Sequence, residues 1–218
     1  MVEISTSLLN AKKDQIIKTI YDIEVAGTDY IHIDVMDGKF VEKDTTEFMR
    51  ECSECAKNIT NLPLDVHLMV KDVENYIKSY LAIEPHSITF HLEACKNNKE
   101  VMKNISLIRE NGVKIGISIK PKTPVEQVYE YLPYVHKVLI MTVEPGKGGQ
   151  KFIPDTLEKI NKLNIFAYEN GYDIDIQVDG GIDNNTCENV KNAGANILVA
   201  GTYIINSTDY KKAILSLK

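Results

Sequence analysis

Short apolar runs alternate with stretches of helical periodicity from one end of the chain to the other. Apolar runs bounded by turn signals are typical of buried strands, and apolar residues three or four positions apart are typical of amphipathic helices. We therefore expect strands at 2–5, 31–35, 62–70, 87–91, 113–119, 135–141, 173–178 and 197–200. We expect helices at 16–26, 46–57, 73–83 and 99–110, from Pro124 onward, and at 154–170, 186–193 and 210–217.

The order of these elements favours a closed barrel. Eight strands in strict alternation with helices, in units of about 25 to 30 residues, fit a (β/α)₈ barrel better than an open doubly wound sheet. The 218 residues suit one large α/β domain, and no linker, charge run or low-complexity segment divides them. We expect an α/β protein whose single TIM-barrel domain spans residues 1–218.

One predicted strand, Ile31-His32-Ile33-Asp34-Val35, carries ionisable side chains at every second position. A strand has a period of two, so His32 and Asp34 point to one face while the aliphatic side chains point to the other. Burying a carboxylate beside an imidazole is costly unless a metal, a partner or a substrate compensates the two groups. The pair is therefore a functional candidate.

Composition and charge narrow the classes of function. The chain is 44% hydrophobic and 26% charged, and its formal net charge is −6, without a basic stripe. This charge disfavours nucleic-acid binding. No apolar run approaches the length of a membrane span, and the start of the chain lacks a signal-peptide core, so we expect a cytoplasmic protein without a membrane partner. An anionic substrate would be held locally, by backbone amides or a metal ion.

Cys52 and Cys55 have the CxxC spacing of a redox pair or of half a zinc site. No second CxxC accompanies them, and they lie in a stretch with helical periodicity. In a cytosolic protein we favour reduced thiols packed on a helix.

Four potential metal ligands lie at the ends of predicted strands. His32 and Asp34 lie toward the end of the second strand, His67 toward the end of the third, and Asp179 directly after the seventh. The carboxyl ends of barrel strands meet at one mouth, where such enzymes have their active site. Any one of these residues alone would be read as a hydrogen-bonded strand-end residue. Together they suit a divalent ion such as zinc, iron, manganese or cobalt.

Other ionisable residues lie near these ends. Asp65 shares a face with His67, so it either supports a metal-binding histidine or makes an ordinary buried polar contact. His91 and Glu93 close the fourth strand, where we favour a structural or supporting role over direct chemistry. His86 and His136 precede strands and are assigned no role.

Glycine-rich segments follow the last three predicted strands. They are residues 144–150, the pair Gly180 and Gly181, and Gly201 followed by Thr202. Glycines allow the main chain to approach an anion, and barrels commonly hold phosphate in the loops after the last strands with a short extra helix, here beginning at Gly201. We expect a phosphate site formed by these loops.

Met36, Met69 and Met141 each lie at or just past the end of a predicted strand. Core filling explains any one of them. As a group they could instead line a water-poor cap over a reacting carbon, and the sequence leaves both readings open.

Four segments together carry a resemblance to a known family. Residues 32–41 (HIDVMDGKFV), 65–70 (DVHLMV), 141–152 (MTVEPGKGGQKF) and 178–182 (VDGGI) resemble the signature segments of the ribulose-phosphate 3-epimerases. The similarity in order and spacing extends from residue 7 to about residue 205, which is nearly the whole chain.

The resemblance implies a TIM barrel that interconverts D-ribulose 5-phosphate and D-xylulose 5-phosphate in the pentose phosphate pathway. By similarity, one divalent metal ion would be bound by His32, Asp34, His67 and Asp179, and Asp34 and Asp179 would also be the two acid/base residues. The resemblance also implies a homo-oligomer, a dimer or a hexamer. The implied substrate-binding residues are Ser7, Met36, His67, Met69, Met141, Gly146, Lys147, Gly148, Gly149, Gly180, Gly181, Gly201 and Thr202.

The chain also departs from the family pattern. After Val41 the family usually continues with Pro-Asn and a Thr-containing turn, whereas this chain has residues 42–46 (EKDTT). Thr6, Lys147 and Thr202 replace a usual proline, aromatic residue and serine. The altered loop leaves open whether the substrate is a pentulose or a hexulose phosphate.

Three other functions remain alternatives at this stage. A 3-epimerase of a ketohexose phosphate, such as allulose 6-phosphate, would share the barrel, the metal and the acid/base pair. A lyase or decarboxylase of the related phosphate-binding barrels would need a lysine in an Asp-x-Lys-x-x-Asp arrangement, where this chain has His67 and Val70. A non-catalytic sugar-phosphate sensor would not need both aspartates.

Overall fold

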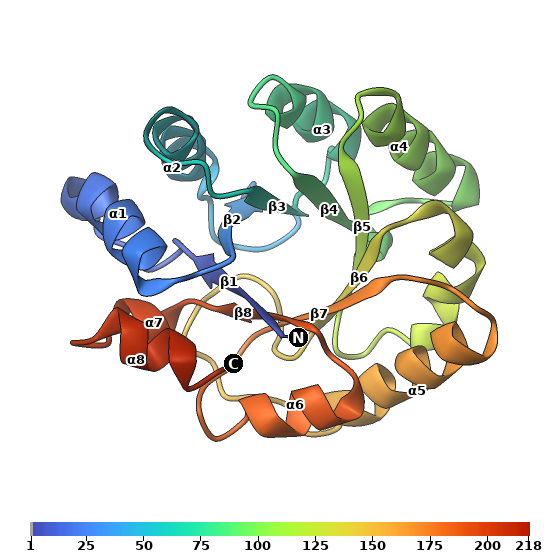
Figure 1. Cartoon of the computed structure of the whole chain (residues 1–218). Helices are drawn as coiled ribbons and strands as arrows, with labels where there is room; N and C mark the ends of the chain where they lie inside the picture. The colour runs from blue at the N-terminus through green and yellow to red at the C-terminus, as the bar shows by residue number, and fades with distance from the viewer. Residues whose placement is uncertain (1) are drawn as a thin grey trace.

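Eight parallel strands close into a barrel in sequence order, and the helices lie around it (Figure 1). The computed structural model describes residues 2–218. The strands are β1 (Glu3–Ser7), β2 (Tyr30–Met36), β3 (Leu64–Met69), β4 (Ser87–His91), β5 (Lys114–Ile119), β6 (Lys137–Met141), β7 (Asp175–Asp179) and β8 (Ile197–Ala200). The helices are α1 (Ile16–Ala26), α2 (Thr46–Ile59), α3 (Val73–Leu81), α4 (Asn98–Glu110), α5 (Thr156–Glu169), α6 (Cys187–Ala193), α7 (Thr202–Ile205) and α8 (Tyr210–Leu215). Short 3₁₀ helices are η1 (Lys13–Gln15), η2 (Leu92–Ala94) and η3 (Val125–Tyr134).

The predicted elements are confirmed, with bounds that differ by at most two residues, except in one segment. The helix expected from Pro124 onward is the 3₁₀ helix η3 rather than an α-helix, and it contains Pro133. Proline has no N–H to donate to an α-helical ladder, and 3₁₀ turns are common in such connections. The thiols are as predicted, since Cys52 and Cys55 lie in α2 and are free.

The two faces of the barrel strands differ in chemistry. On β2, Ile31, Ile33 and Val35 belong to the large hydrophobic cluster that joins the sheet to the surrounding helices. His32 and Asp34, on the other face, are buried around the barrel axis. Hydrocarbon therefore holds the sheet to the helices, and polar side chains fill much of the barrel interior.

The carboxylate of Asp65 on β3 is the centre of that polar interior. Four groups donate to its oxygens over 2.5 to 3.0 Å, and they belong to Ser5, His32, Ser87 and Gln177. Lys137, the first residue of β6, forms a buried ion pair with it. Gly116 makes room for the lysine, because a Cβ there would lie 3.0 Å from the Lys137 side chain and 2.2 Å from Thr89 Oγ1. Strands from around the barrel are thus joined through one buried anion.

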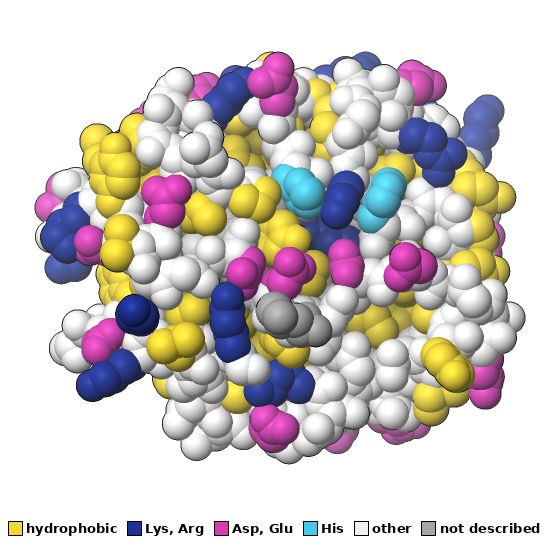
Figure 2. Space-filling view, in the orientation of Figure 1, with side chains coloured by type: hydrophobic (Ala, Val, Ile, Leu, Met, Phe, Trp, Pro, Cys, Tyr) yellow, Lys and Arg dark blue, Asp and Glu magenta, His cyan; other side chains and the backbone are white. Residues whose placement is uncertain are grey.

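The amino-terminal end of the barrel is the face drawn in Figure 2, where two histidines flank basic side chains near the centre. His86 and His136 directly precede β4 and β6 and line a small opening of about 10 Å³ there. The predicted site residues lie at the opposite ends of the strands. Among residues 2–218, no helix has both the length and the apolar character needed to cross a bilayer.

Candidate active site

The structure brings the four predicted ligands together at the carboxyl ends of the strands. His32 and Asp34 come from β2, His67 from β3 and Asp179 from the end of β7. Each offers one ligand atom, and these atoms all lie within 4.8 Å of one another. The alternation along β2 and β3 explains this convergence, because parallel register places Asp34 beside His67.

The nitrogen atoms that face this cluster are suited to a metal. His32 Nδ1 donates to Asp65 Oδ2 over 2.8 Å, so a neutral His32 has an unprotonated Nε2. That Nε2 is buried, makes no hydrogen bond within residues 2–218, and lies 3.3 Å from Asp34 Oδ1. His67 Nδ1 lies 3.2 Å from the same oxygen and 3.8 Å from Asp179 Oδ2. Each of these nitrogens can donate to the Asp34 carboxylate when protonated or bind a cation when unprotonated, so the donor set fits a divalent transition metal.

The surroundings shift the pKa values of the two aspartates in opposite directions. Burial alone would raise the pKa of Asp34, but the imidazoles of His32 and His67 outweigh burial and lower this pKa below its usual range. Burial and the negative charge of Asp34 raise the pKa of Asp179 to about 7. One carboxyl group is therefore ionised while the other holds a proton near neutral pH, as acid/base catalysis with two carboxyl groups requires.

The two histidines are also unequal. Burial tends to lower the pKa of His32, but the carboxylates of Asp34 and Asp65 raise it to about 10. Burial lowers the pKa of His67 to about 4, so this imidazole is neutral at physiological pH. A metal would displace a proton from His32 and none from His67.

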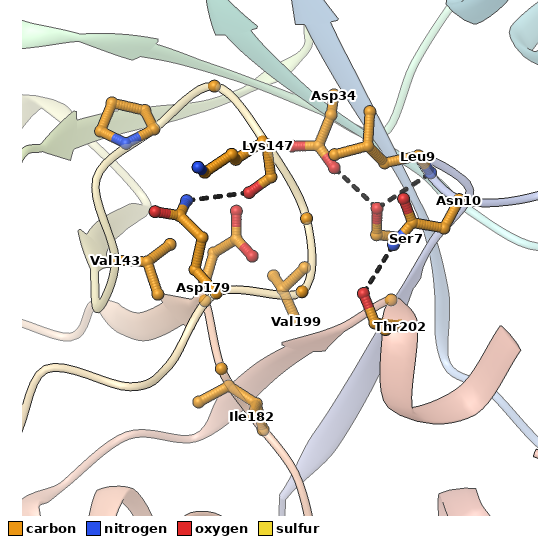
Figure 3. A pocket seen from close by; sticks show the side chains of 18 of the residues that line it. Ser7, Leu9, Asn10, Asp34, Val143, Lys147, Asp179, Ile182, Val199 and Thr202 are labelled. Carbon is orange, nitrogen blue, oxygen red and sulfur yellow. Dashed lines mark hydrogen bonds between the residues drawn. The ribbon is translucent and has the colours of Figure 1, made fainter. Parts of the chain in front are cut away.

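A cavity of about 260 Å³ opens at this mouth, with Ser7, Asp34 and Asp179 in its wall (Figure 3). Ser7 Oγ donates to Asp34 Oδ2 over 2.7 Å and accepts from Leu9 N, so it holds one oxygen of the carboxylate. His32 and His67 are wholly buried and do not belong to the lining. The expectation that His67 contacts substrate stays a prediction.

The three predicted methionines lie in the same wall. Met36, Met69 and Met141 line the cavity and are at most 2% exposed. They come from β2, β3 and β6. Their sulfur and methyl groups make the part of the cavity beside the carboxylates poor in polar groups.

The glycine-rich loops form the outer wall of the cavity. The lining includes Gly146, Lys147, Gly148, Gly149, Gly180, Gly181, Gly201 and Thr202. Gly180 has φ +122°, and a Cβ there would lie 2.3 Å from a methyl group of Val143, so only glycine fits. The short helix expected after Gly201 is α7. The three loops therefore share one cavity with the carboxylates.

Sequence reasoning missed Asn10 and Lys137. Asn10 lines the cavity, donates to Thr202 Oγ1 over 2.6 Å and packs against Gly148 (Figure 3). It follows β1 in a loop without a recognisable motif, so the sequence offered no signal. Lys137 did leave a signal, because it shares a strand face with Met141 at a spacing of four residues.

The residues assigned supporting roles do contact the ligands. Asp65 bonds His32, on the neighbouring strand, rather than His67, whose strand it shares. His91 Nε2 lies 3.0 Å from His67 Nε2, and His91 Nδ1 lies 3.1 Å from Glu93 Oε2. His32 and His67 thus each have a hydrogen-bonded partner on the nitrogen that points away from the cluster, as metal-binding histidines usually do.

The altered loop after Val41 is anchored beside the mouth without entering it. Asp37 accepts from the backbone N–H groups of residues 39, 40 and 71, and Thr45 bonds the β2 backbone at Asp34 and Met36. The cavity lining includes none of residues 42–46, all of which the structure describes. Val41 instead packs against Gly146 of the glycine loop.

Together, a parallel eight-stranded barrel, paired carboxylates and glycine loops at one mouth are typical of a (β/α)₈-barrel enzyme, and this mouth carries a cluster that could hold a metal ion. The chain belongs to the ribulose-phosphate 3-epimerase family, whose sequence model matches residues 3–205. It is therefore an isomerase of the epimerase type.

Full-length relatives support this assignment. The chain is 40% identical to a ribulose-phosphate 3-epimerase of Bacillus subtilis, over 100% of this chain and 99% of the relative. It is 38% identical to a protein of the same name from Methanocaldococcus jannaschii, over 100% and 90% of the two chains. A solved structure of 3-hexulose-6-phosphate synthase from Salmonella typhimurium superposes with a TM-score of 0.73 at 14% sequence identity. The superposition covers 99% of this chain and 96% of that one. That likeness concerns the fold alone.

Proposed function

We propose that this chain interconverts D-ribulose 5-phosphate and D-xylulose 5-phosphate by proton transfer at C3, with Asp34 and Asp179 as the two acid/base groups. The observation that carries the proposal is the pair itself. Two carboxyl groups lie in one cluster, and their surroundings lower one pKa and raise the other.

Inversion of a carbon beside a ketone needs a base on one face and an acid on the other. In this proposal, ionised Asp34 or Asp179 removes the C3 proton, an enediolate forms, and the protonated partner returns a proton to the opposite face. Ser7 holds Asp34 through its 2.7 Å hydrogen bond, so this carboxylate keeps its orientation while it exchanges a proton. The methionine wall keeps water from the planar intermediate.

His32, Asp34, His67 and Asp179 would hold one divalent ion of the zinc, iron, manganese or cobalt group. When bound, this ion supplies Lewis-acid stabilisation of negative charge on the substrate oxygens. The chain provides the neutral imidazole of His67 and the carboxylates that such an ion requires.

We assign the phosphate to the outer wall, where the loops around Gly146, Gly180 and Gly201 line the cavity and would offer backbone N–H groups to an anion. Lys147 lies in the same wall and adds a positive charge. The cavity joins this wall to the carboxylates, so a five-carbon sugar phosphate would extend from one to the other (Figure 3).

We favour a pentulose phosphate over a hexulose phosphate as the substrate because of the residues that line the cavity. The departure from the family pattern at residues 42–46 raised the possibility of a longer substrate. Those residues lie outside the cavity lining, whereas Val41, which keeps the family residue, touches the glycine loop. A coupled assay that offers both sugar phosphates distinguishes the two activities.

The test is hydrogen exchange at C3 in heavy water, followed by mass spectrometry of the sugar phosphate. The metal-loaded protein should incorporate one deuterium at C3 of either epimer. Asp34→Asn and Asp179→Asn should each lower turnover by at least about 10³-fold, because each removes one half of the proton transfer.

Asp72→Asn serves as the matched control. Asp72 is the exposed N-cap of α3, where asparagine caps a helix equally well, so activity should stay unchanged. Retention of full exchange by Asp179→Asn would contradict the two-aspartate mechanism, and binding of the sugar phosphate without any exchange would indicate a sensor.

A further inference from the structure

The second metal-facing histidine, His67, is held by a buried chain of side chains that ends at Glu93. His67 Nε2 lies 3.0 Å from His91 Nε2, and His91 Nδ1 lies 3.1 Å from Glu93 Oε2. His67 and His91 are wholly buried, and their rings stack with centroids 5.1 Å apart. Neither ring is exposed to solvent, so their protons are set by each other, by Glu93 and by Asp34, whose Oδ1 lies 3.2 Å from His67 Nδ1.

Glu93, at the far end of this series of side chains, can only accept hydrogen bonds. The other oxygen of Glu93, Oε1, accepts from the backbone N–H of Lys120 over 2.7 Å and from the Thr123 hydroxyl. The contacts from His91 and from these two donors hold the pKa of Glu93 below its usual range despite burial. Glu93 is therefore an ionised acceptor at both oxygens.

The proton positions follow from that acceptor. A carboxylate accepts only, so His91 Nδ1 must carry a proton, and the neutral His91 ring then has an unprotonated Nε2. That Nε2 is an acceptor for His67 Nε2–H. Without a metal ion, the ionised Asp34 carboxylate competes for the same proton at His67 Nδ1. A metal ion bound at Nδ1 would end this competition and leave the proton on Nε2, facing His91.

We propose that Glu93 is a positioning residue that acts through His91 to support the His67 tautomer whose Nδ1 is free to bind a metal ion. Glu93 does not touch the cluster itself. This inference rests on the proposed metal site, and its test reads zinc affinity and a histidine tautomer rather than activity.

The two proposed histidine ligands thus differ in how they are hydrogen-bonded to a carboxylate. His32 bonds directly to the carboxylate of Asp65, deep in the barrel. His67 reaches its carboxylate through a second imidazole, and that carboxylate is tied to the loop after β5 at Lys120. Phe40 from the loop after β2 covers His91, with ring centroids 4.9 Å apart.

Glu93→Gln reverses this chain of hydrogen bonds with almost no change in shape. The backbone N–H of Lys120 cannot turn away, so it retains the carboxamide oxygen and leaves the NH₂ group facing His91 Nδ1. His91 would then carry its proton on Nε2 and donate to His67 Nε2. The proton of His67 would move to Nδ1, where a metal would have to displace it.

The experiment measures the tautomer of His91 in zinc-loaded protein labelled with ¹⁵N-histidine, through long-range ¹H–¹⁵N correlations. The chain has five histidines, so single substitutions suffice to assign the signals. The wild type should show His91 protonated at Nδ1, the atom that faces Glu93. Zinc affinity of Glu93→Gln, measured by chelator competition, should fall by about 10–100-fold.

Thr123→Val is the matched control, because it removes one hydrogen bond from Glu93 and leaves the carboxylate in place. It should keep the wild-type tautomer and zinc affinity within about threefold. A zinc-loaded wild type with His91 protonated at Nε2, or an unchanged zinc affinity in a folded Glu93→Gln protein, overturns the proposal. If Glu93→Gln does not fold, the wild-type spectrum still decides. Failure of the wild type to bind zinc would instead count against the proposed metal site.

Discussion

Asp34 and Asp179 are the same residue type in one cluster, yet their neighbours differ. Two imidazoles surround Asp34 and lower its pKa, whereas Asp179 faces the Asp34 carboxylate and has its pKa raised to about 7. The difference comes from the strands that supply the neighbours. His32 and His67 flank Asp34 along β2 and β3, and the nearest of these nitrogens to Asp179 lies 3.8 Å away.

This asymmetry predicts how metal binding depends on pH. The pKa of Asp179 is about 7, so below this pH Asp179 is mostly protonated in the metal-free protein. A metal must then displace that proton. Zinc should therefore release about 0.8 more proton per ion at pH 6 than at pH 8, and its affinity should fall as the pH decreases through 7. Isothermal titration calorimetry in two buffers of different ionisation enthalpy counts these protons.

The same calorimetry on Asp179→Asn provides the comparison, since asparagine cannot supply a proton. The difference between pH 6 and pH 8 should disappear in this variant. Equal proton release by the wild type at both pH values would show that the protonation of Asp179 does not change between pH 6 and pH 8.

At the scale of elements, the ion pair between Lys137 on β6 and Asp65 on β3 crosses the barrel interior. Both side chains are at most 6% exposed. A buried charge that loses its partner costs far more than an exposed one, because neither water nor another cation replaces it. The pair therefore contributes to the stability of the barrel and to the position of the Asp65 carboxylate beside His32.

Lys137→Met should lower the free energy of unfolding by about 3 kcal/mol, as measured by urea denaturation of metal-free protein. Adding Asp65→Asn should restore part of the loss, because the uncompensated charge is then removed. Lys18→Met, which breaks the exposed pair of Lys18 and Asp22, should cost under about 0.5 kcal/mol. Equal losses for the two single variants would mean that burial adds nothing to the Lys137 pair.

The sequence predicted the elements well because the strand alternation and the helical periodicity were both strong. It also placed His32, Asp34, His67 and Asp179 at one mouth, since parallel strands bring their carboxyl ends together. It could not say that Asp65 bonds His32, because that choice depends on register between neighbouring strands. The 3₁₀ form of η3 was missed for a similar reason, since helical periodicity does not distinguish two hydrogen-bonding patterns over a short segment.

At the scale of the whole molecule, the four proposed ligands come from strands that are distant around the barrel. β2 and β3 are neighbours, but β7 is separated from β2 by β8 and β1. An ion held by all four residues would bind the folded chain and would have no such site in the unfolded chain, so it would add its binding free energy to the stability of the fold.

Removal of the metal should therefore lower the melting temperature. Free zinc at 100 times its dissociation constant adds about 2.7 kcal/mol. For a chain of this size the corresponding shift is about 5–10 °C, measured by differential scanning calorimetry with and without EDTA. Asp179→Asn should show a smaller shift. An identical melting temperature with and without chelator in the wild type would contradict a bound ion in the purified protein.

The aliphatic faces of the strands pack against the helices and take no part in the mouth, and this has a consequence for how the protein can change over generations. A substitution in the cavity wall at the mouth leaves both the contacts between sheet and helices and the Asp65–Lys137 pair intact, so an altered catalytic repertoire costs the scaffold little. New substrates are thus accessible to descendants of this chain without a new architecture.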